Sequence, residues 1–321
     1  MRLISDNPQQ RSAFFKRLSL ELLGALIIIV GVTFLAFLLS YLSPTDPAIR
    51  YFTDKGMIPT ETELATKRHE LGLDLPFWQQ YSNWIVSMLH GDMGNSYRTG
   101  NSVFGSLMFS LPYTLALTFT SMTLTLLIAV PLGLLCAKRK DSALDNAVRA
   151  FSYLFCSIPT FLVALVLLYI FSVQLHVLPT SSKDAIGLIM PTLALAIPLA
   201  AWYVRQVRTI ALEQYAKPYV DGLRSRGISE HDILFKHILK NSLVPILALV
   251  GISLGGLLGG SAIIECIFAW PGVGNLSVSA INSRDYAVVQ GYALLMAIVY
   301  LVMNWILDAV YRVIDPRIGG R

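Results

Sequence analysis

Charged residues are scarce in this sequence of 321 residues: Asp, Glu, Lys and Arg make up 14%, against 55% hydrophobic residues. The mean hydropathy of +0.59 is too high for two soluble domains, and it excludes a disordered or fibrous chain. The apolar residues gather in long runs, and a helix that crosses a bilayer needs about 20 of them. The sequence therefore predicts an all-α polytopic membrane protein.

Motifs for catalysis and metal binding are also missing. The sequence contains no Gly-Lys pair, so it lacks the loop G-x-x-x-x-G-K-[ST] that cradles nucleotide phosphates. It has neither H-E-x-x-H nor Cys-x-x-Cys, and its three cysteines define no disulfide framework. Gly251-Ile252-Ser253-Leu254-Gly255 matches a nucleophile elbow, but it lies in an apolar run whose glycines favour close helix packing. If ATP drives this protein, another chain binds the ATP and magnesium, and we expect no cofactor in this one.

Six apolar runs are predicted to be transmembrane helices, and they cover residues 22–42, 111–137, 150–173, 186–204, 243–264 and 288–307. If the amino terminus is cytoplasmic, most Lys and Arg residues lie on the cytoplasmic side, whereas the acidic residues divide evenly. This asymmetry follows the positive-inside rule and predicts that both termini are cytoplasmic. The net charge of +5 is thus an orientation signal, and nucleic-acid binding is not needed to explain it.

Two connections are long enough to carry function. The first, residues 43–110, is predicted to be extracytoplasmic and is called the outer segment below. Within it, Thr60 and Glu63 have the spacing of a capping box, and Gly72 is placed to end the short surface helix that follows.

The second connection, residues 213–241, is predicted to be cytoplasmic and is called the inner loop. Pro218 is suited to the first turn of a helix, and Gly227 can end that helix in the left-handed conformation. Ser229 can cap the next helix, with Asp232 at its capping-box position. The pattern predicts a short helix, a sharp turn and a second helix that returns to the membrane.

Polar residues near the membrane have ordinary explanations and open alternatives. Glu265 stands where the fifth apolar run meets the turn Trp270-Pro271-Gly272, and we interpret it as an anchor that accepts hydrogen bonds from that turn. The five histidines are scattered outside the apolar runs. A dedicated metal site is therefore not expected, although an external histidine that contacts a passing metal stays open.

The inner loop resembles the cytoplasmic EAA loop of permease subunits of ABC importers. Asp221-Gly222-Leu223 is followed by Gly227, and Pro245 comes later. The match departs from the general pattern, because Asp replaces Glu, Gly-Leu replaces Ala-Ala, and the proline is displaced. The arrangement of helix, glycine and helix is nevertheless retained.

A more specific resemblance, to the peptide/nickel branch of these permeases, extends over almost the whole chain. Many short motifs occur in the same order as in that branch. They are Thr45-Asp46-Pro47-Ala48; Leu71-Gly72-Leu73-Asp74 with Pro76, Gln80 and Tyr81; Gly91-Asp92-Met93-Gly94 with Ser96; Leu111-Pro112 with Thr114-Leu115; Ser157-Ile158-Pro159; Leu178-Pro179; Ile263-Ile264-Glu265 with Ile267 to Gly274; Arg284-Asp285-Tyr286 with Gln290; and Asp315-Pro316-Arg317.

The resemblance implies the six-helix core of a type I ABC importer permease. The expected layout is a cytoplasmic tail (1–21), a first transmembrane helix (22–42), the extracytoplasmic outer segment (43–110), a five-helix core (111–312) that contains the inner loop, and a second cytoplasmic tail (313–321). It also implies that the inner loop docks on an ATPase. The residues expected to couple the two are Asp221, Gly222, Leu223, Arg224, Arg226 and Gly227.

The implied partners are a second homologous permease, two ATP-binding subunits and an extracytoplasmic solute-binding protein, at a bacterial inner membrane. The implied cargo is nickel, a metal chelate or a small peptide, and the outer segment slightly favours the nickel and metallophore members. A chelate presents carboxylates and an organic rim, so a path without ligand histidines suits a chelate or a dipeptide better than a bare ion.

Two other classes remain as alternatives. A secondary transporter would show paired half-repeats with interrupted helices, and an integral membrane enzyme would need converging polar groups at membrane depth. The sequence offers neither pattern. Uptake without ATP would revive the first alternative, and hydrolysis by the isolated chain would revive the second.

Overall fold

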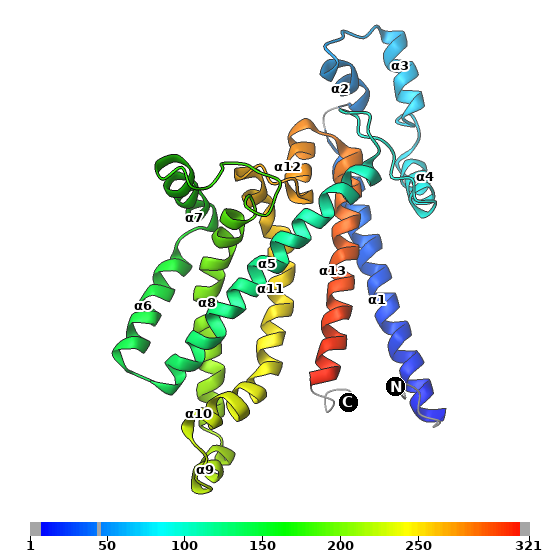
Figure 1. Ribbon diagram of the computed structural model, residues 1–321. Helices are drawn as coiled ribbons and strands as arrows, with labels where there is room; N and C mark the ends of the chain where they lie inside the picture. The colour runs from blue at the N-terminus through cyan, green and yellow to red at the C-terminus, as the bar shows by residue number, and fades with distance from the viewer. Residues whose placement is uncertain (1–7, 44–45, 315–321) are drawn as a thin grey trace. The chain divides into compact units, whose positions relative to one another are not determined.

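The computed structural model describes residues 8–43 and 46–314, so parts of both predicted tails and the dipeptide 44–45 lie outside it (Figure 1). The described residues are mostly helical. The helices are α1 (Pro8–Tyr41), α2 (Pro47–Asp54), α3 (Glu61–Glu70), α4 (Phe77–Leu89), α5 (Val103–Lys138), α6 (Ala143–Ser157), α7 (Thr160–Leu167), the π-helix η1 (Leu168–Gln174), α8 (Ile189–Tyr215), α9 (Pro218–Ser225), α10 (Glu230–Asp232), the π-helix η2 (Ile233–Ile238), α11 (Leu239–Ile267), α12 (Val273–Ser283) and α13 (Tyr286–Ile314).

Four helical segments within the described residues are long and apolar enough to cross a membrane: Ser19–Tyr41, Val103–Lys138, Glu230–Ile267 and Tyr286–Tyr311. A fifth is added if the bent pair of α6 with α7 and η1 counts as one span. The predicted span 186–204 falls in α8 from Ile189 onward, and α8 is not in this set. Since α8 contacts α6, α7 and α11, much of its surface faces protein and does not have to be as apolar as a lipid-facing helix.

The predicted span 150–173 is not one straight helix. It is broken between α6 and α7, and the two parts meet at 97°. Ile158 has an extended backbone with ψ of 126°, because a residue before a proline is disfavoured in the helical region. Pro159 then precedes the first turn of α7. The bend is therefore encoded in the dipeptide Ile158-Pro159.

The chain divides into two compact units: Met1–Phe109 with Ser279–Val302, and Ser110–Val278 with Met303–Arg321. In the first unit, aromatic rings of α1 pack against rings of α4. The pairs include Phe34 with Trp78 and Phe37 with Tyr81, whose ring centroids lie 5.9 and 5.4 Å apart. Beside them, Asp46 caps α2 and pairs with Arg68 of α3 at 2.6 Å.

The predicted surface helix of the outer segment is confirmed as α3. Thr60 and Glu63 form the capping box, and α3 buries none of its residues. Gly72 has a φ of +66°, and its N–H and that of Leu73 bond back to carbonyls of α3. Local backbone preferences therefore decide where α3 begins and ends.

In the second unit, α8 lies side by side with α6 and α11, and α9 and α10 lie at one end of α8 (Figure 1). Small buried residues on α8, such as Ala194 and Ala211, allow close packing. Gly133 of α5 makes the closest approach: a Cβ there would lie 2.7 Å from Cβ of Val207. Only glycine therefore fits at that contact.

Candidate functional site

The inner loop adopts the predicted arrangement of helix, turn and helix. Pro218 occupies the first turn of α9, and Gly227 follows its end with a φ of +77°. The N–H of Gly227 donates to the carbonyl of Arg224 at 2.9 Å, and that of Ile228 donates to the carbonyl of Leu223 at 3.2 Å. This pair of bonds is the Schellman motif, in which glycine takes the left-handed position. A β-branched residue at position 227 would strain the turn.

The next helix begins as predicted. Ser229 caps α10 by accepting a hydrogen bond from the N–H of Asp232 at 3.2 Å. Asp232 in turn pairs with Lys236 at 2.9 Å. The chain then continues through η2 into α11 without a break in the helical backbone.

The short helix α9 rests on a hydrophobic core. Val220 is fully buried, and so are Ile233, Leu234 and Ile238 of η2. The same core includes apolar side chains from α5, α8 and α11, and Leu223 and Ile228 pack against it. Leu223, one of the predicted coupling residues, thus packs on the side of α9 that faces this core. A helix fixed in this way moves with the core beneath it.

The other predicted coupling residues face outward. The side chain of Asp221 is 79% exposed, and a Cβ added to Gly222 would meet no atom within 4 Å. Arg224 is engaged within its own loop, since Nε donates to Glu230 at 2.6 Å and Nη1 donates to Asp221 at 3.2 Å. The bond to Glu230 raises the pKa of the Arg224 guanidinium. Arg224 thereby fastens α9 to α10, and Arg226 is exposed at the end of α9.

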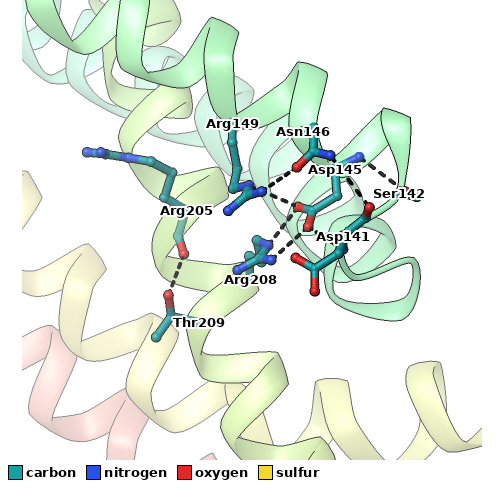
Figure 2. A network of polar contacts seen from close by, with 8 residues as sticks. All are labelled: Asp141, Ser142, Asp145, Asn146, Arg149, Arg205, Arg208 and Thr209. Atoms are coloured by element: carbon teal, nitrogen blue, oxygen red, sulfur yellow. Dashed lines mark hydrogen bonds and ion pairs between the residues drawn. The ribbon is translucent and has the colours of Figure 1, made fainter.

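A buried ion pair joins α6 to α8 in the same unit (Figure 2). Arg208 donates from Nε and Nη2 to the two carboxylate oxygens of Asp145, each at 2.7 Å. The Asp145 side chain is fully buried, and it also accepts from the N–H of Asp141 at 2.9 Å. A two-bond contact between a guanidinium and a carboxylate fixes both direction and distance. We call this pair the Asp145–Arg208 clasp.

The contact between Asp145 and Arg208 was not predicted from the sequence. The local signal was present, since Ser142 caps α6 and accepts from the N–H of Asp145. Its partner stands 63 positions further along the chain, and nothing in a single sequence links the two. One turn before Arg208 on α8, Arg205 lies over the ring of Tyr153 at 4.8 Å from its centroid. Two arginines of α8 therefore hold α6.

Glu265 is fully buried and organises the turn that follows α11. Its carboxylate accepts from Thr114 at 2.7 Å, from Ser261 at 3.1 Å and from the N–H of Asn275 at 2.9 Å. Asn275 lies in the first turn of α12, so Glu265 caps that helix from a neighbouring one. The turn Trp270-Pro271-Gly272 itself donates to the backbone carbonyl of Glu265, from the N–H of Trp270 at 2.8 Å, and the carboxylate instead holds the start of α12.

Motifs that lie far apart in the sequence meet in the first unit. Asp285 is 4% exposed, and it accepts from the hydroxyl of Ser96 at 2.5 Å and from the N–H of Tyr97 at 3.1 Å. Ser43 and Tyr286 are hydrogen-bonded through their hydroxyls. Ser43 and the dipeptide Ser96-Tyr97 therefore bind the start of α13, which the order of motifs in the sequence did not predict.

Among the described residues, no group of three or more His, Cys, Asp or Glu side chains could hold a metal ion. The cysteines Cys136, Cys156 and Cys266 are free.

On α11, a Cβ added to Gly256, Gly259 or Gly260 would meet nothing within 4 Å, so within the described structure these glycines do not pack against the chain itself.

Comparison with known proteins gives matches along nearly the whole chain. A family model described as "Binding-protein-dependent transport system inner membrane component" matches residues 129–320. A second, described as "Binding-prot-dependent transport system membrane comp, N-term", matches residues 14–118.

Individual relatives differ in the solute that their names give. The chain is 32% identical to the probable D,D-dipeptide transport system permease protein DdpB of Escherichia coli, over 92% of this chain and 95% of that protein. It is 31% identical to the metal-staphylopine import system permease protein CntB of Staphylococcus aureus, over 91% of this chain and 94% of that protein. A chain of the MetNI methionine ABC transporter in an inward-facing conformation matches with a TM-score of 0.57 at 22% identity, over 65% of this chain and 96% of that chain, which supports a shared fold.

Proposed function

This chain belongs to the family of inner membrane components of binding-protein-dependent transport systems, and from that premise we propose that its inner loop couples solute passage to ATP hydrolysis on a partner chain. The chain has the type I ABC importer permease fold. It is a permease for peptides or for nickel and other metal chelates. Members of this family are not catalytic themselves, so the hydrolysis belongs to a partner.

The observation that carries the proposal is the construction of α9. Its inner face is anchored by the fully buried Val220, whereas Asp221 and Gly222 are presented outward. The Schellman turn at Gly227 and the bond from Arg224 to Glu230 fix its angle to α10. A rigid helix with one free face suits a groove on an ATPase, because a displacement of the groove moves the helix as a body.

The same contacts provide a route into the membrane core. The residues under α9 belong to α5, α8, η2 and α11, and the Asp145–Arg208 clasp extends the connection from α8 to α6. Closure of the ATPase pair on ATP would favour one arrangement of these helices over another. The coupling is then a shift between an inward-open and an outward-open population, and its size is the difference in contact energy between the two states.

The remaining parts of the proposal concern topology and partners. Both termini and the inner loop face the cytoplasm, and the outer segment faces the solute-binding protein. The chain works with a second permease and two ATP-binding subunits. The unpacked face of α11 at Gly256, Gly259 and Gly260 supports a second permease, since small residues allow transmembrane helices to approach closely.

We propose a chelated metal as the first cargo to test and a di- or oligopeptide as the second. Relatives named for both kinds of solute match this chain at nearly equal identity. The two cargoes share carboxylates on a small organic frame. Measuring which of them the partner binding protein captures distinguishes the two directly.

The test replaces Gly227 by valine in the complex reconstituted into proteoliposomes with its ATPases and binding protein. A non-glycine residue in the left-handed region costs about 1–2 kcal/mol, which corresponds to roughly a fivefold to thirtyfold change in an equilibrium. We expect solute-stimulated ATP hydrolysis and uptake to fall together by a factor in that range.

Gly56→Val is the matched control. Gly56 has a φ of +68° and open space around it, so valine imposes the same backbone strain in the outer segment. We expect this variant to retain normal coupling. The proposal fails if Gly227→Val couples as well as Gly56→Val, or if labelling from outside the cell reaches residues 213–241.

A further inference from the structure

A cavity of about 610 Å³ lies within the first unit. One wall is aromatic and comes from α1 and α4, with Phe37, Tyr41 and Trp84. Another wall is charged and includes Asp46 and Arg68. Pockets of about 300–1,000 Å³ with apolar walls and a few polar groups are typical of sites for small organic molecules.

The walls of this cavity are fixed by contacts that do not involve a ligand. Asp46 accepts from the N–H of Ala48 at 2.8 Å and from Nε of Arg68 at 2.6 Å, which joins α2 to α3. Gln80 donates to the carbonyls of Leu73 and Leu75 and so ties α4 to the turn after α3. The cavity is therefore formed before a solute arrives, which reduces the ordering cost of binding.

Arg68 offers donors that the described structure does not use. Its Nε is bonded to Asp46, but among the described residues its two terminal nitrogens have no hydrogen-bond partner. The side chain is 47% exposed and lines the cavity. A guanidinium has five N–H donors, and its terminal pair matches the two oxygens of a carboxylate. The two terminal nitrogens of Arg68 are thus available to donate to a carboxylate.

The remaining walls suit an organic body with an amine. The faces of Phe37, Tyr41 and Trp84 can pack against aliphatic groups and can attract a cationic nitrogen. Gln290 of α13 is 6% exposed and also lines the cavity, which adds an amide that can donate and accept. The lining carries both signs of charge, since Asp46 and Glu70 stand in it together with Arg68.

We propose that this cavity is a binding site for a small organic solute that carries a carboxylate, with Arg68 as the carboxylate anchor and the aromatic wall against the organic frame. The inference rests on the proposed function, and it adds a site on the outer segment that the solute occupies before it enters the path. A peptide and a carboxylate-bearing metal chelate share this chemistry.

The test uses the complete complex in lipid nanodiscs, with a dipeptide that contains a photoactivatable leucine as the probe. After irradiation, mass spectrometry locates the labelled residues. Unlabelled dipeptide, the same dipeptide with an amidated carboxyl end, and nickel citrate serve as three competitors. We expect labels on residues that line the cavity, competition by the free dipeptide or by nickel citrate, and at least tenfold weaker competition by the amide. The effective competitor identifies the source of the carboxylate.

Two substitutions in α4 test whether the labelling depends on the space inside the cavity. Ser87 lines the cavity and Ser82 does not, although both are exposed positions of the same helix. Ser87→Trp fills the space, and we expect it to reduce labelling about tenfold and to raise the KM of uptake with little change in kcat. Ser82→Trp introduces the same side chain outside the cavity, and we expect wild-type labelling and KM.

Several outcomes would overturn the inference. Labelling that persists in Ser87→Trp shows that the probe does not bind in the cavity. Equal competition by the amide shows that binding does not depend on a carboxylate. Displacement of the probe by phospholipid alone assigns the cavity to a lipid headgroup. A loss in Ser87→Trp of ATPase stimulation by the solute-free binding protein assigns it to a protein contact. A wild-type complex without ATP-driven uptake contradicts the proposed function instead, and this is measured first.

Discussion

The inner loop and the outer segment both consist of short capped helices, yet they are held in different ways. In the inner loop, Val220 of α9 and Leu234 of η2 are fully buried in a shared hydrophobic core. In the outer segment, α3 and α4 bury no residue. The ion pair of Arg68 with Asp46 holds α3, and aromatic contacts with α1 hold α4. Packing in a core suits the transmission of a displacement, whereas helices that share no buried core leave space for a cavity.

The largest expected effect tests whether the region around the inner loop also depends on a polar contact. Asp145→Ala leaves the guanidinium of Arg208 without its carboxylate. Breaking a buried pair costs about 3–5 kcal/mol, and we expect the lower end because the Arg208 side chain is 14% exposed. The measurement is the apparent melting temperature of the purified complex.

Asn146→Ala, on the adjacent position of α6, is the control and should melt close to the wild type. The double variant Asp145→Ala with Arg208→Ala should lose less than the sum of the two single variants, because no unpaired charge remains. Equal melting of Asp145→Ala and Asn146→Ala would show that the clasp contributes nothing to stability.

The next prediction compares the two regions directly. Val220→Ala removes two buried carbons from under α9 and should cost about 2 kcal/mol. Leu64→Ala shortens a side chain of α3, which buries none of its residues, and should cost under about 1 kcal/mol. Hydrogen exchange is expected to accelerate strongly in α9 for the first variant and only slightly in α3 for the second. Equal acceleration would remove the distinction between the two regions.

A smaller effect is expected from a polar contact in the first unit. Ser96→Ala removes one of two donors to the buried carboxylate of Asp285 and should cost about 1 kcal/mol. The N–H of Thr99, which donates to the Ser96 hydroxyl at 3.0 Å, should exchange faster, whereas the N–H of Tyr97 keeps its bond to Asp285. Exchange at Thr99 as slow as in the wild type would contradict this assignment. Ser82→Ala is the control on an exposed face of α4.

The smallest expected effect is a difference in acid sensitivity. Hydrogen bonds from Thr60 lower the pKa of Glu63 in α3 below its ordinary value of 4.5. A carboxyl with a depressed folded pKa stabilises above its unfolded pKa, and this contribution is lost as the pH falls through the folded value. The cap of α3 should therefore weaken below about pH 4.5.

We expect α3 to fray in acid and α10 to stay folded, because α10 continues into the π-helix η2, which buries Ile233, Leu234 and Ile238. Amide exchange measured between pH 6 and pH 3.5, after correction for the intrinsic rate, reports the difference. In Glu63→Gln the acid-dependent part of the change in α3 should disappear. Its persistence in that variant would assign the fraying to another group.

The sequence was sufficient for features that depend on neighbouring residues. Thr60 with Glu63, Pro218, Gly227 and Ser229 mark helix ends through backbone preferences that act over a few positions, and the structure has each of them where the sequence predicted it. The polytopic, all-helical class followed from composition in the same way. These features need no knowledge of the distant parts of the chain.

Contacts between distant residues were not predictable in this way. Asp145 meets Arg208, and Ser96 meets Asp285 from 189 positions away, because packing brings distant segments together. Leu223 was predicted as a coupling residue without a direction, and it packs against the core. The dipeptide Ile158-Pro159 was recognised only as a motif, although its backbone restriction was a readable signal for the bend between α6 and α7.

That bend also solves a problem of length. A straight helix from Ala143 to Gln174 would measure about 48 Å at 1.5 Å per residue, while the hydrocarbon core of a bilayer is about 30 Å thick. Folding the rod at 97° shortens its reach along any one axis without removing a residue. A single proline thus lets the sequence keep more helical surface than a straight crossing could accommodate.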